Sequence, residues 1–218
     1  MPRLLFEKTG DAVWISHLDL MRLWQRAFKR AGLMLTHTQG FNPRPSVSIA
    51  MPMSVGMESI AELLDFDLDG ERPPCDEICR RLNSALVPGV KCLKVYDQGR
   101  KLRELSQMDC RIALRYIYGL PDHAEERIRA LFEQEALPVE KRGKNGPVKQ
   151  NIRPMIKSLN ITAENDSVVL SARICCQEPS LNPMQLAAAV EHYLPDLKAD
   201  EVLCRRLEIY DKTGNIFR

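Results

Sequence analysis

The sequence lacks an apolar run long enough to cross a bilayer, which takes roughly 20 residues in a helix. It also lacks the long apolar core of a secretory signal, and the opening MPRLLFEKTGD carries an acid at Glu7. A large excess of charge is missing too, since the formal net charge is only +2. We therefore expect a cytoplasmic protein with no membrane role, whose binding properties depend on where its charges lie.

Closely spaced metal ligands are also scarce. Cys75 and Cys79 are four positions apart, as at the start of a radical S-adenosylmethionine cluster motif, but Leu82 stands where that motif needs its third cysteine. Cys175 and Cys176 are adjacent, and no second close pair accompanies them in the sequence. Seven cysteines, an odd number, are typical of reduced and buried thiols in a chain of this size. We expect no metal site and no cofactor bound by this chain.

The first half of the sequence has a clear order of strand and helix patterns. Ser16 predicts a helix N-cap with Asp19 as its partner, and Gly32 predicts the end of the same helix. The order is β-α-β-β-α-β, which is the ferredoxin-like arrangement. The predicted strands are 3–8, 46–51, 61–68 and 90–96, and the predicted helices are 17–31 and 75–86.

The pattern restarts in the second half. It predicts strands over 110–118, 155–162, 167–176 and 202–210, helices over 122–134 and after Asn182, and two short strands, 137–141 and 148–152, around a turn. We therefore expect an α+β protein of two tandem ferredoxin-like domains, the second with an extra basic β-hairpin. The predicted domains are 1–98 and 109–218, joined by a linker at 99–108.

Ser16, His17 and Asp19 bring the residue types of a hydrolase triad close together in sequence. His17 and Asp19 point about 200° apart on a helix, so they cannot share the hydrogen bond that a base and its orienting acid need. Capping accounts for Ser16 and Asp19. His17, beside exposed N–H groups, can bind an anion, act as a general base or simply pack. His17 and His37 are the catalytic candidates, since two histidines near one groove suit metal-free RNA cleavage.

Side chains suited to nucleic acid occur in three segments. The first helix has a basic stripe, and the loop QGFNPRPSVS offers planar amides, a ring for stacking and an arginine. The segment EKRGKNGPVKQNIRP holds five cations and one acid, a composition that suits a hairpin gripping a phosphate backbone. An ordinary solvated surface is the alternative for each. The predicted nucleic-acid-binding residues are Arg22, Arg26, Gln39, Phe41, Asn42, Arg44, Lys141, Arg142, Lys144, Lys149 and Arg153.

Several short elements resemble the signature of the radical-SAM-linked proteins, a bacterial family of undefined activity. These elements are Lys8-Thr9-Gly10, Ser16 to Asp19, Gln39 to Pro43, Pro52 to Ser59, and Asn151 to Ile156. In the last of them, Asn151 stands where the family has an acid. The resemblance implies a place beside, or fused to, a radical SAM enzyme. It implies that the partner, and not this chain, holds S-adenosylmethionine and an iron–sulfur cluster.

Three functions are compatible with this sequence. The first is an accessory module that holds RNA or an RNA-containing complex and presents it to a radical SAM partner. The second is a metal-independent endoribonuclease with His17 and His37 as acid and base, by analogy with CRISPR repeat-processing nucleases of similar fold. The third is a protein-interaction scaffold that docks an acidic partner without nucleic acid. We expect the first, without intrinsic catalytic activity, and the sequence leaves the oligomeric state open.

Overall fold

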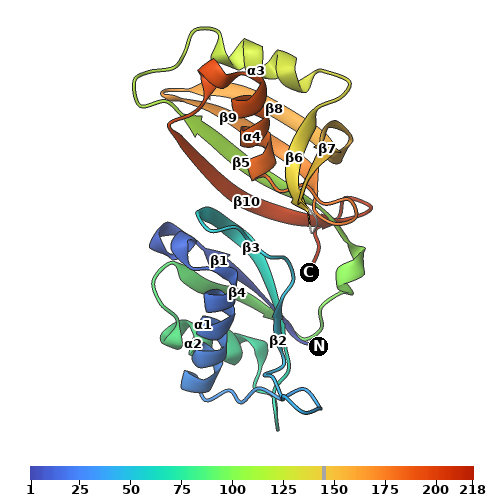
Figure 1. Cartoon of the computed structure of the whole chain (residues 1–218). Coiled ribbons are helices and arrows are strands. Elements are labelled where there is room, and N and C mark those ends of the chain that lie inside the picture. The colour runs from blue at the N-terminus through green and yellow to red at the C-terminus, as the bar shows by residue number, and fades with distance from the viewer. Residues whose placement is uncertain (144–145) are drawn as a thin grey trace. The chain divides into compact units, whose positions relative to one another are not determined.

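A computed structural model describes residues 1–143 and 146–218, and the side chains of residues 142–145 are not described. The chain is an α+β protein (Figure 1). It divides into two compact units, one formed by Met1–Glu104 with Ile216–Arg218 and the other by Leu105–Asn215. Within the described residues, no helix is both long and apolar enough to span a membrane.

The first unit packs two helices on one face of an antiparallel sheet (Figure 1). Its strand order is β4-β1-β3, and β2 pairs with β3 on the side away from β1. Two 3-10 helices, η1 (Gly10–Trp14) and η2 (Leu102–Glu104), connect these elements. The helices and strands are β1 (Arg3–Lys8), α1 (His17–Arg30), β2 (Val47–Ile49), β3 (Met57–Phe66), α2 (Cys75–Ala85) and β4 (Val90–Tyr96).

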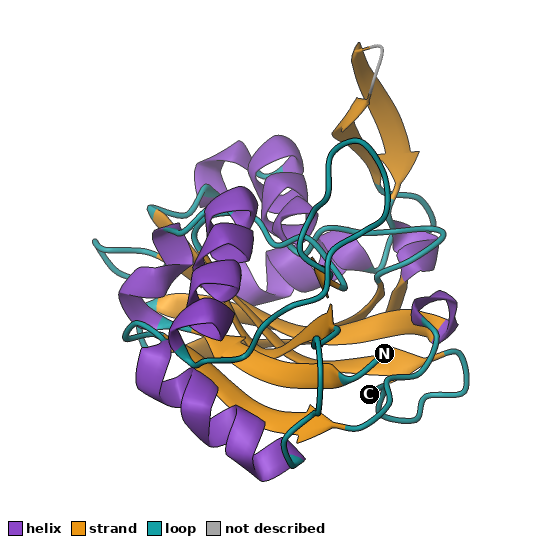
Figure 2. Ribbon diagram, turned by 90° about the horizontal axis from the view of Figure 1, so that it is seen from below, coloured by secondary structure: helices purple, strands orange, loops and turns teal. Residues whose placement is uncertain are grey.

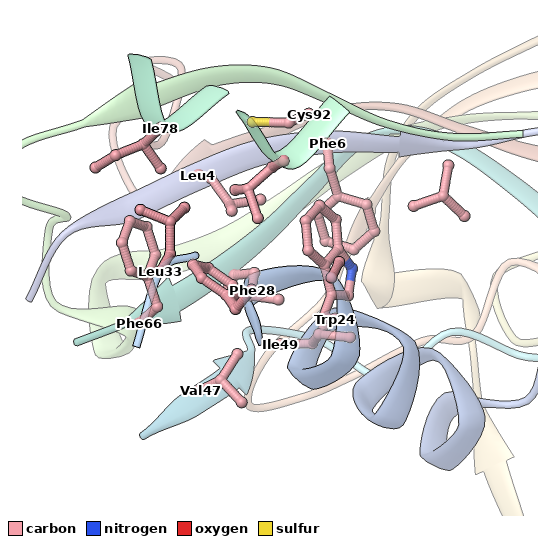
Figure 3. Close-up of a cluster of buried hydrophobic side chains, with 14 of the residues drawn as sticks. Leu4, Phe6, Trp24, Phe28, Leu33, Val47, Ile49, Phe66, Ile78 and Cys92 are labelled. Carbon is pink, nitrogen blue, oxygen red and sulfur yellow. The ribbon is translucent and has the colours of Figure 1, made fainter. Parts of the chain in front are cut away.

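Aromatic rings form the centre of this unit's core (Figure 3). The ring centroids of Phe6 and Trp24 lie 5.0 Å apart, those of Trp24 and Phe28 lie 6.3 Å apart, and those of Phe28 and Phe66 lie 5.0 Å apart. Strand residues alternate between faces, so Phe6 and Lys8 share the face of β1 that the helices cover. A lysine therefore continues the buried face of an apolar strand.

The start of α1 agrees with the sequence prediction. The Asp19 N–H donates to Ser16 Oγ at 3.2 Å, which confirms Ser16 as the N-cap. The hydroxyl of Ser16 also donates to the Asp19 carboxylate at 2.8 Å. β3 begins at Met57, before its predicted start, because one of its first buried positions is the polar Ser59, which hides the alternation of buried residues over 57–60.

The second unit has its own antiparallel arrangement. Its strand order is β10-β5-β9-β8. The hairpin β6–β7 forms a separate two-stranded sheet, which Figure 2 shows projecting outward. Its base contacts α4, where the hydroxyl of Tyr193 donates to the carbonyl of Pro138 at 2.8 Å. The helices and strands are β5 (Leu105–Arg115), α3 (Ala124–Phe132), β6 (Pro138–Gly143), β7 (Gly146–Asn151), β8 (Ile156–Glu164), β9 (Ser167–Cys175), α4 (Met184–Tyr193) and β10 (Glu201–Asp211).

Two predicted boundaries in this region differ from the structure. Residues 105–108, predicted as linker, are strand, because Leu105 and Met108 are buried although polar residues surround them in sequence. α3 starts two residues later than predicted, since His123 has a φ of 56° and ends the preceding turn in the left-handed region. The proposed limits of independently folding domains stay a prediction.

Candidate functional site

A cluster of polar side chains lies at the N-terminal end of α1. Lys8 from β1, His17 from α1 and Glu62 from β3 line one recess, whose wall is completed by apolar side chains that include Met51 and Met53. We call it the Lys8 recess. It holds about 190 Å³ of empty space, open solvent at its mouth included, and is nowhere wide enough for a water molecule. Its polar groups are of the kind used in acid–base chemistry, but a ligand can enter only if side chains move.

Backbone carbonyls hold the ammonium of Lys8 in place. This residue is 1% exposed, and its Nζ donates to the carbonyl oxygens of Val13 at 3.1 Å and Ile15 at 2.9 Å. Burial lowers the pKa of Lys8, and the negative charge of Glu62 partly opposes that shift. Both carbonyls belong to the segment that leads into α1, so Lys8 fixes where this helix begins.

The two candidate catalytic histidines lie at opposite ends of the first unit's core. His17 is half-buried in the Lys8 recess near Glu62. His37 is exposed and follows Leu35, which forms a bridge with Leu68 beyond the end of β3. At ~3.3 Å per residue, the extended chain separates Leu68 from Glu62 by about 20 Å. The structure therefore does not bring the two imidazoles together.

The exposed side of α1 carries the predicted basic stripe. Arg22 forms an ion pair with Asp19 at 2.8 Å on the open surface. Arg26, Lys29 and Arg30 are also exposed, and they form no ion pair within the part of the chain that the structure describes. The last two lie in the final turn, where the helix dipole favours cations. Arg26 lies before that turn and has no such local role.

The loop after α1 presents the second group of predicted residues. The Thr38 N–H donates to the Arg44 carbonyl at 2.8 Å, and the Arg44 N–H donates to Thr38 Oγ1 at 3.0 Å, which closes the loop. Phe41, between them, is 111% exposed, and Gln39 and Asn42 are exposed as well. A fully hydrated phenylalanine ring gains free energy when a partner covers it. The loop is therefore shaped by its own backbone and offers a ring and amides to solvent.

The predicted basic hairpin is present as β6 and β7. Glu140 pairs with Lys149 and Lys141 with Val148 across it, and both lysines are exposed. Val139 is buried at its base. The two other predicted cations cannot be placed, since Lys144 and the side chain of Arg142 lie outside the described residues.

Arg153 does not belong to the hairpin strands. It opens the 3-10 helix η3 (Arg153–Met155) and lines a groove with Arg129, Glu133 and Lys157, between α3 and β8. We call this the β8 groove. It has about 670 Å³ of empty space, open solvent at its mouth included. All of its lining residues belong to the second unit.

Asn151 organises the turn that leads to Arg153. Its Oδ1 accepts hydrogen bonds from the N–H of Leu137 at 2.8 Å and the N–H of Arg153 at 3.2 Å. A carboxylate at this position could accept the same two bonds. The amide therefore replaces an acid of the resembled family without losing this geometry.

The cysteines are placed for packing. All seven are free, and five of them are buried. Burial raises the pKa values of Cys92, Cys110 and Cys204, which favours the neutral thiol over the thiolate that metals require. Within the described residues, no group of three or more cysteine, histidine or acidic side chains could hold a metal ion.

A comparison with protein families covers most of the chain. The family profile described as "Uncharacterized protein conserved in bacteria (DUF2344)" matches residues 2–183. The chain belongs to the DUF2344 family. This agrees with the expected bacterial family of undefined activity, and the description makes no mention of radical SAM enzymes. No curated protein matches the chain.

The comparison with solved structures concerns only the fold of this DUF2344 protein. A chain of the "Crystal Structure of a Cbf5-Nop10-Gar1 Complex" is similar with a TM-score of 0.51 and 6% identity, over 97% of this chain and 50% of that chain. The "Crystal Structure of an Unknown Protein from Galdieria sulphuraria" gives a TM-score of 0.27 at 10% identity, over 94% of this chain and 96% of that chain. The DUF2344 chain thus spans half the length of the first of these chains.

Sequence reasoning missed several residues of this DUF2344 protein that the structure places in the Lys8 recess or at the start of α1. Glu62 reaches the Lys8 recess from a strand far along the chain. Trp14 and Leu18 lie just before and just inside the start of α1, and they are 71% and 66% exposed. Trp14 lies beside Gly56, so that a β-carbon at position 56 would be 3.7 Å from its ring. The periodicity of α1 gave no signal for Trp14, because it precedes the helix.

Proposed function

We propose that this DUF2344 protein is an accessory module that binds single-stranded RNA or an RNA-containing complex. The proposal rests on two neighbouring features: α1 carries exposed cations that form no ion pair in the described part of the chain, and the loop that follows carries a fully exposed ring. Arg26, Lys29 and Arg30 form no ion pair among the described residues, and Phe41 is completely exposed. Phosphates are attracted to such cations, and unpaired bases stack on such rings.

The position of the loop supports a shared interface in the first unit. Lys29 and Arg30 lie in the last turn of α1, and the chain passes directly from that turn toward the loop. Arg44 closes the loop through its backbone while its side chain stays exposed. We propose that phosphates contact α1 and Arg44, that a base stacks on Phe41, and that Gln39 and Asn42 contact base edges.

A binding measurement tests this interface. Fluorescence anisotropy with a labelled, mixed-sequence single-stranded RNA should show binding by the wild-type chain. Phe41→Ala should weaken it about tenfold, because a stacked base contributes ~1–3 kcal/mol. Tyr118→Ala is the matched control, since Tyr118 is also an almost fully exposed ring (96%) but lies outside this interface. Equal affinities for wild type and Phe41→Ala would remove the loop from the interface, and absence of RNA binding would favour the scaffold hypothesis.

The basic hairpin is the second contact that we propose. Lys141 and Lys149 extend from the second unit on β6 and β7 and can grip a phosphate backbone without reading sequence. Arg22 has a local acidic partner in Asp19, so it is expected to contribute less than Arg26.

We further propose that each unit is a ferredoxin-like domain. In the first unit the chain order β-α-β-β-α-β goes with the sheet order β4-β1-β3-β2. In the second unit β5, β8, β9 and β10 take the same four places in the order β10-β5-β9-β8, with the hairpin inserted after α3. The recurrence of this order supports the proposal.

A radical SAM enzyme in the cytoplasm is the partner that we propose. The support is the resemblance of Lys8 to Gly10, Ser16 to Asp19 and Gln39 to Pro43 to the radical-SAM-linked signature. The partner would supply S-adenosylmethionine and the cluster, and this chain would place the substrate. Crosslinking and co-purification from the native cell test this. Recovery of RNA without a radical SAM enzyme would support the RNA-binding part of the proposal and contradict the proposed enzyme partner.

Endoribonuclease activity is the second candidate function. The Lys8 recess favours it, since His17 lies there with Lys8 and Glu62. Against it stand the narrowness of the recess and the distance to His37. Incubating RNA with wild-type protein and with His17→Ala in EDTA decides the matter. RNA that stays intact in the presence of bound wild-type protein excludes the nuclease, whereas cleavage that His17→Ala abolishes supports it.

A further inference from the structure

The β8 groove borders an edge of the second unit's sheet. The order β10-β5-β9-β8 leaves β8 paired with β9 on one side. An edge strand presents backbone N–H and C=O groups that another extended chain can pair with. Proteins commonly cover such edges or cap their backbone groups with side chains. On β8, only some of the outward-facing backbone groups have a hydrogen-bond partner in the part of the chain that the structure describes.

Two side chains of α3 show which groups face outward. Arg129 Nη2 donates to the carbonyl of Ile161 at 2.6 Å, and the N–H of Ala163 donates to Glu125 Oε2 at 2.8 Å. Alternate residues of a strand face the same side, so the N–H and C=O of Leu159 face outward as well. Within the described residues, no side chain caps Leu159. α3 thus closes one end of the edge and leaves the end beside the groove open.

The lining of the groove selects the chemistry of an occupant. Phe132, Ile156 and Leu159 provide an apolar floor. Glu125 pairs with Arg129 at 2.6 Å, and Glu133 adds one acid to the lining. Arg153 and Lys157 have no carboxylate partner among the described residues, so cations still exceed acids around the groove. An open backbone edge beside apolar side chains and two unmatched cations is complementary to an extended, acidic polypeptide.

We propose that the β8 groove binds an extended acidic segment of a partner protein, which adds as a short strand beside Leu159. Its backbone exchanges hydrogen bonds with the N–H and C=O of Leu159, its apolar side chains pack on the half-buried Leu159 side chain, and its carboxylates face Arg153 and Lys157. RNA is a poorer match, because it has no alternating N–H and C=O groups to satisfy a strand edge. This use of Arg153 goes beyond the RNA interface proposed above.

A peptide titration of the full-length chain tests the groove. The probe is a short, end-blocked peptide of alternating glutamate and valine, followed by NMR of the ¹⁵N-labelled protein. Binding should shift the amide signals of Leu159 and Ile161 and slow their hydrogen exchange. A matched lysine–valine peptide should not bind. The same glutamate–valine peptide with every backbone nitrogen methylated should lose affinity, because neither of its edges can then donate a hydrogen bond to β8.

Two protein variants separate charge from strand addition. Arg153→Glu should weaken binding of the acidic peptide about fivefold. Leu159→Pro removes an N–H that points away from β9, so the fold should survive while peptide binding is lost. Lys149→Glu, the same charge change on the hairpin, is the control and should leave the peptide affinity unchanged.

The outcomes distinguish this proposal from the RNA proposal. Loss of RNA binding in Lys149→Glu together with retained peptide binding supports two separate sites. Equal binding of the acidic and basic peptides, or unchanged affinity in both Arg153→Glu and Leu159→Pro, overturns the peptide groove. Displacement of the peptide by single-stranded RNA, with the same amides shifted, would assign the groove to nucleic acid and overturn it as well.

Discussion

Lys8 shows how a single residue can carry more structure than its sequence context suggests. The alternation that places Phe6 on the covered face of β1 also places Lys8 there. The sequence cannot name the carboxylate that faces it, since Glu62 comes from another strand. The burial of an ammonium costs free energy unless hydrogen bonds and an opposite charge offset it, and here two carbonyls and Glu62 do so.

The first prediction concerns this lysine. Lys8→Met should lower the free energy of unfolding by about 3 kcal/mol, because it removes the donor to Val13 and Ile15 and leaves the buried Glu62 without its cation. Urea unfolding followed by circular dichroism measures it. Lys91→Met, an exposed lysine on the adjacent strand, should cost far less. If both variants are equally stable, Lys8 does not hold the start of α1.

At the scale of elements, some boundaries follow from local chemistry and others do not. The start of α1 was predictable because Ser16 caps it, and the hairpin was predictable from turn residues between two short strand patterns. The limits of β3 and the start of β5 were not, since a buried polar residue or polar neighbours hide the alternation. Local patterns reveal periodicity, whereas these limits depend on which distant strand lies alongside.

Some features of the candidate site were likewise predictable from the sequence, and others were not. The sequence identified the exposed cations and Phe41, because residue type alone indicates what they can bind. It did not show that His37 lies far from His17, since their separation depends on the path of the chain along β3. The outward-facing groups of β8 were equally inaccessible, because sheet order decides which strand forms an edge.

The second prediction concerns a hydrogen-bond network that joins three strands of the second unit. Asp109 on β5 accepts from Arg173 on β9 at 2.8 and 2.9 Å and from the hydroxyl of Tyr210 on β10 at 2.7 Å. Burial by itself would raise the pKa of Asp109, but these hydrogen bonds outweigh it and hold the pKa below its usual value. The stabilisation is therefore complete above the ordinary aspartate pKa and is lost as pH falls through the lower, folded-state pKa.

Asp109→Asn tests that network by its pH dependence. The variant should be less stable than wild type near neutral pH, and the difference should shrink below about pH 4 as the wild-type carboxylate becomes protonated. Denaturant unfolding across this range measures it. Asp122→Asn, at an exposed aspartate of the same unit, should differ little from wild type near neutral pH. A gap between Asp109→Asn and wild type that stays constant to about pH 3 would contradict the assignment.

At the scale of the whole molecule, the balance of charge and its distribution lead to different expectations. A net charge of +2 predicts weak, unspecific attraction to a polyanion. Many arginines, such as Arg80 and Arg127, are matched by nearby acids. Arg26, Arg30 and Arg44 form no ion pair in the described part of the chain. Local cations, and not the total, should therefore govern RNA binding.

The third prediction is the salt dependence that follows from this distribution. If Arg26, Lys29, Arg30 and Arg44, together with Lys141 and Lys149 of the hairpin, each contact a phosphate, the logarithm of the RNA affinity should fall with the logarithm of salt concentration. The slope should be about −4, at ~0.7 per contact for a single strand. The double variant Arg26→Gln with Arg30→Gln should reduce that slope by about 1.4. The double variant Arg80→Gln with Arg127→Gln removes the same charge from arginines already paired with Glu77 and Asp196, and it should leave the slope unchanged. Equal reductions in both variants would mean that net charge alone attracts the RNA, and that α1 is not a specific phosphate-binding face.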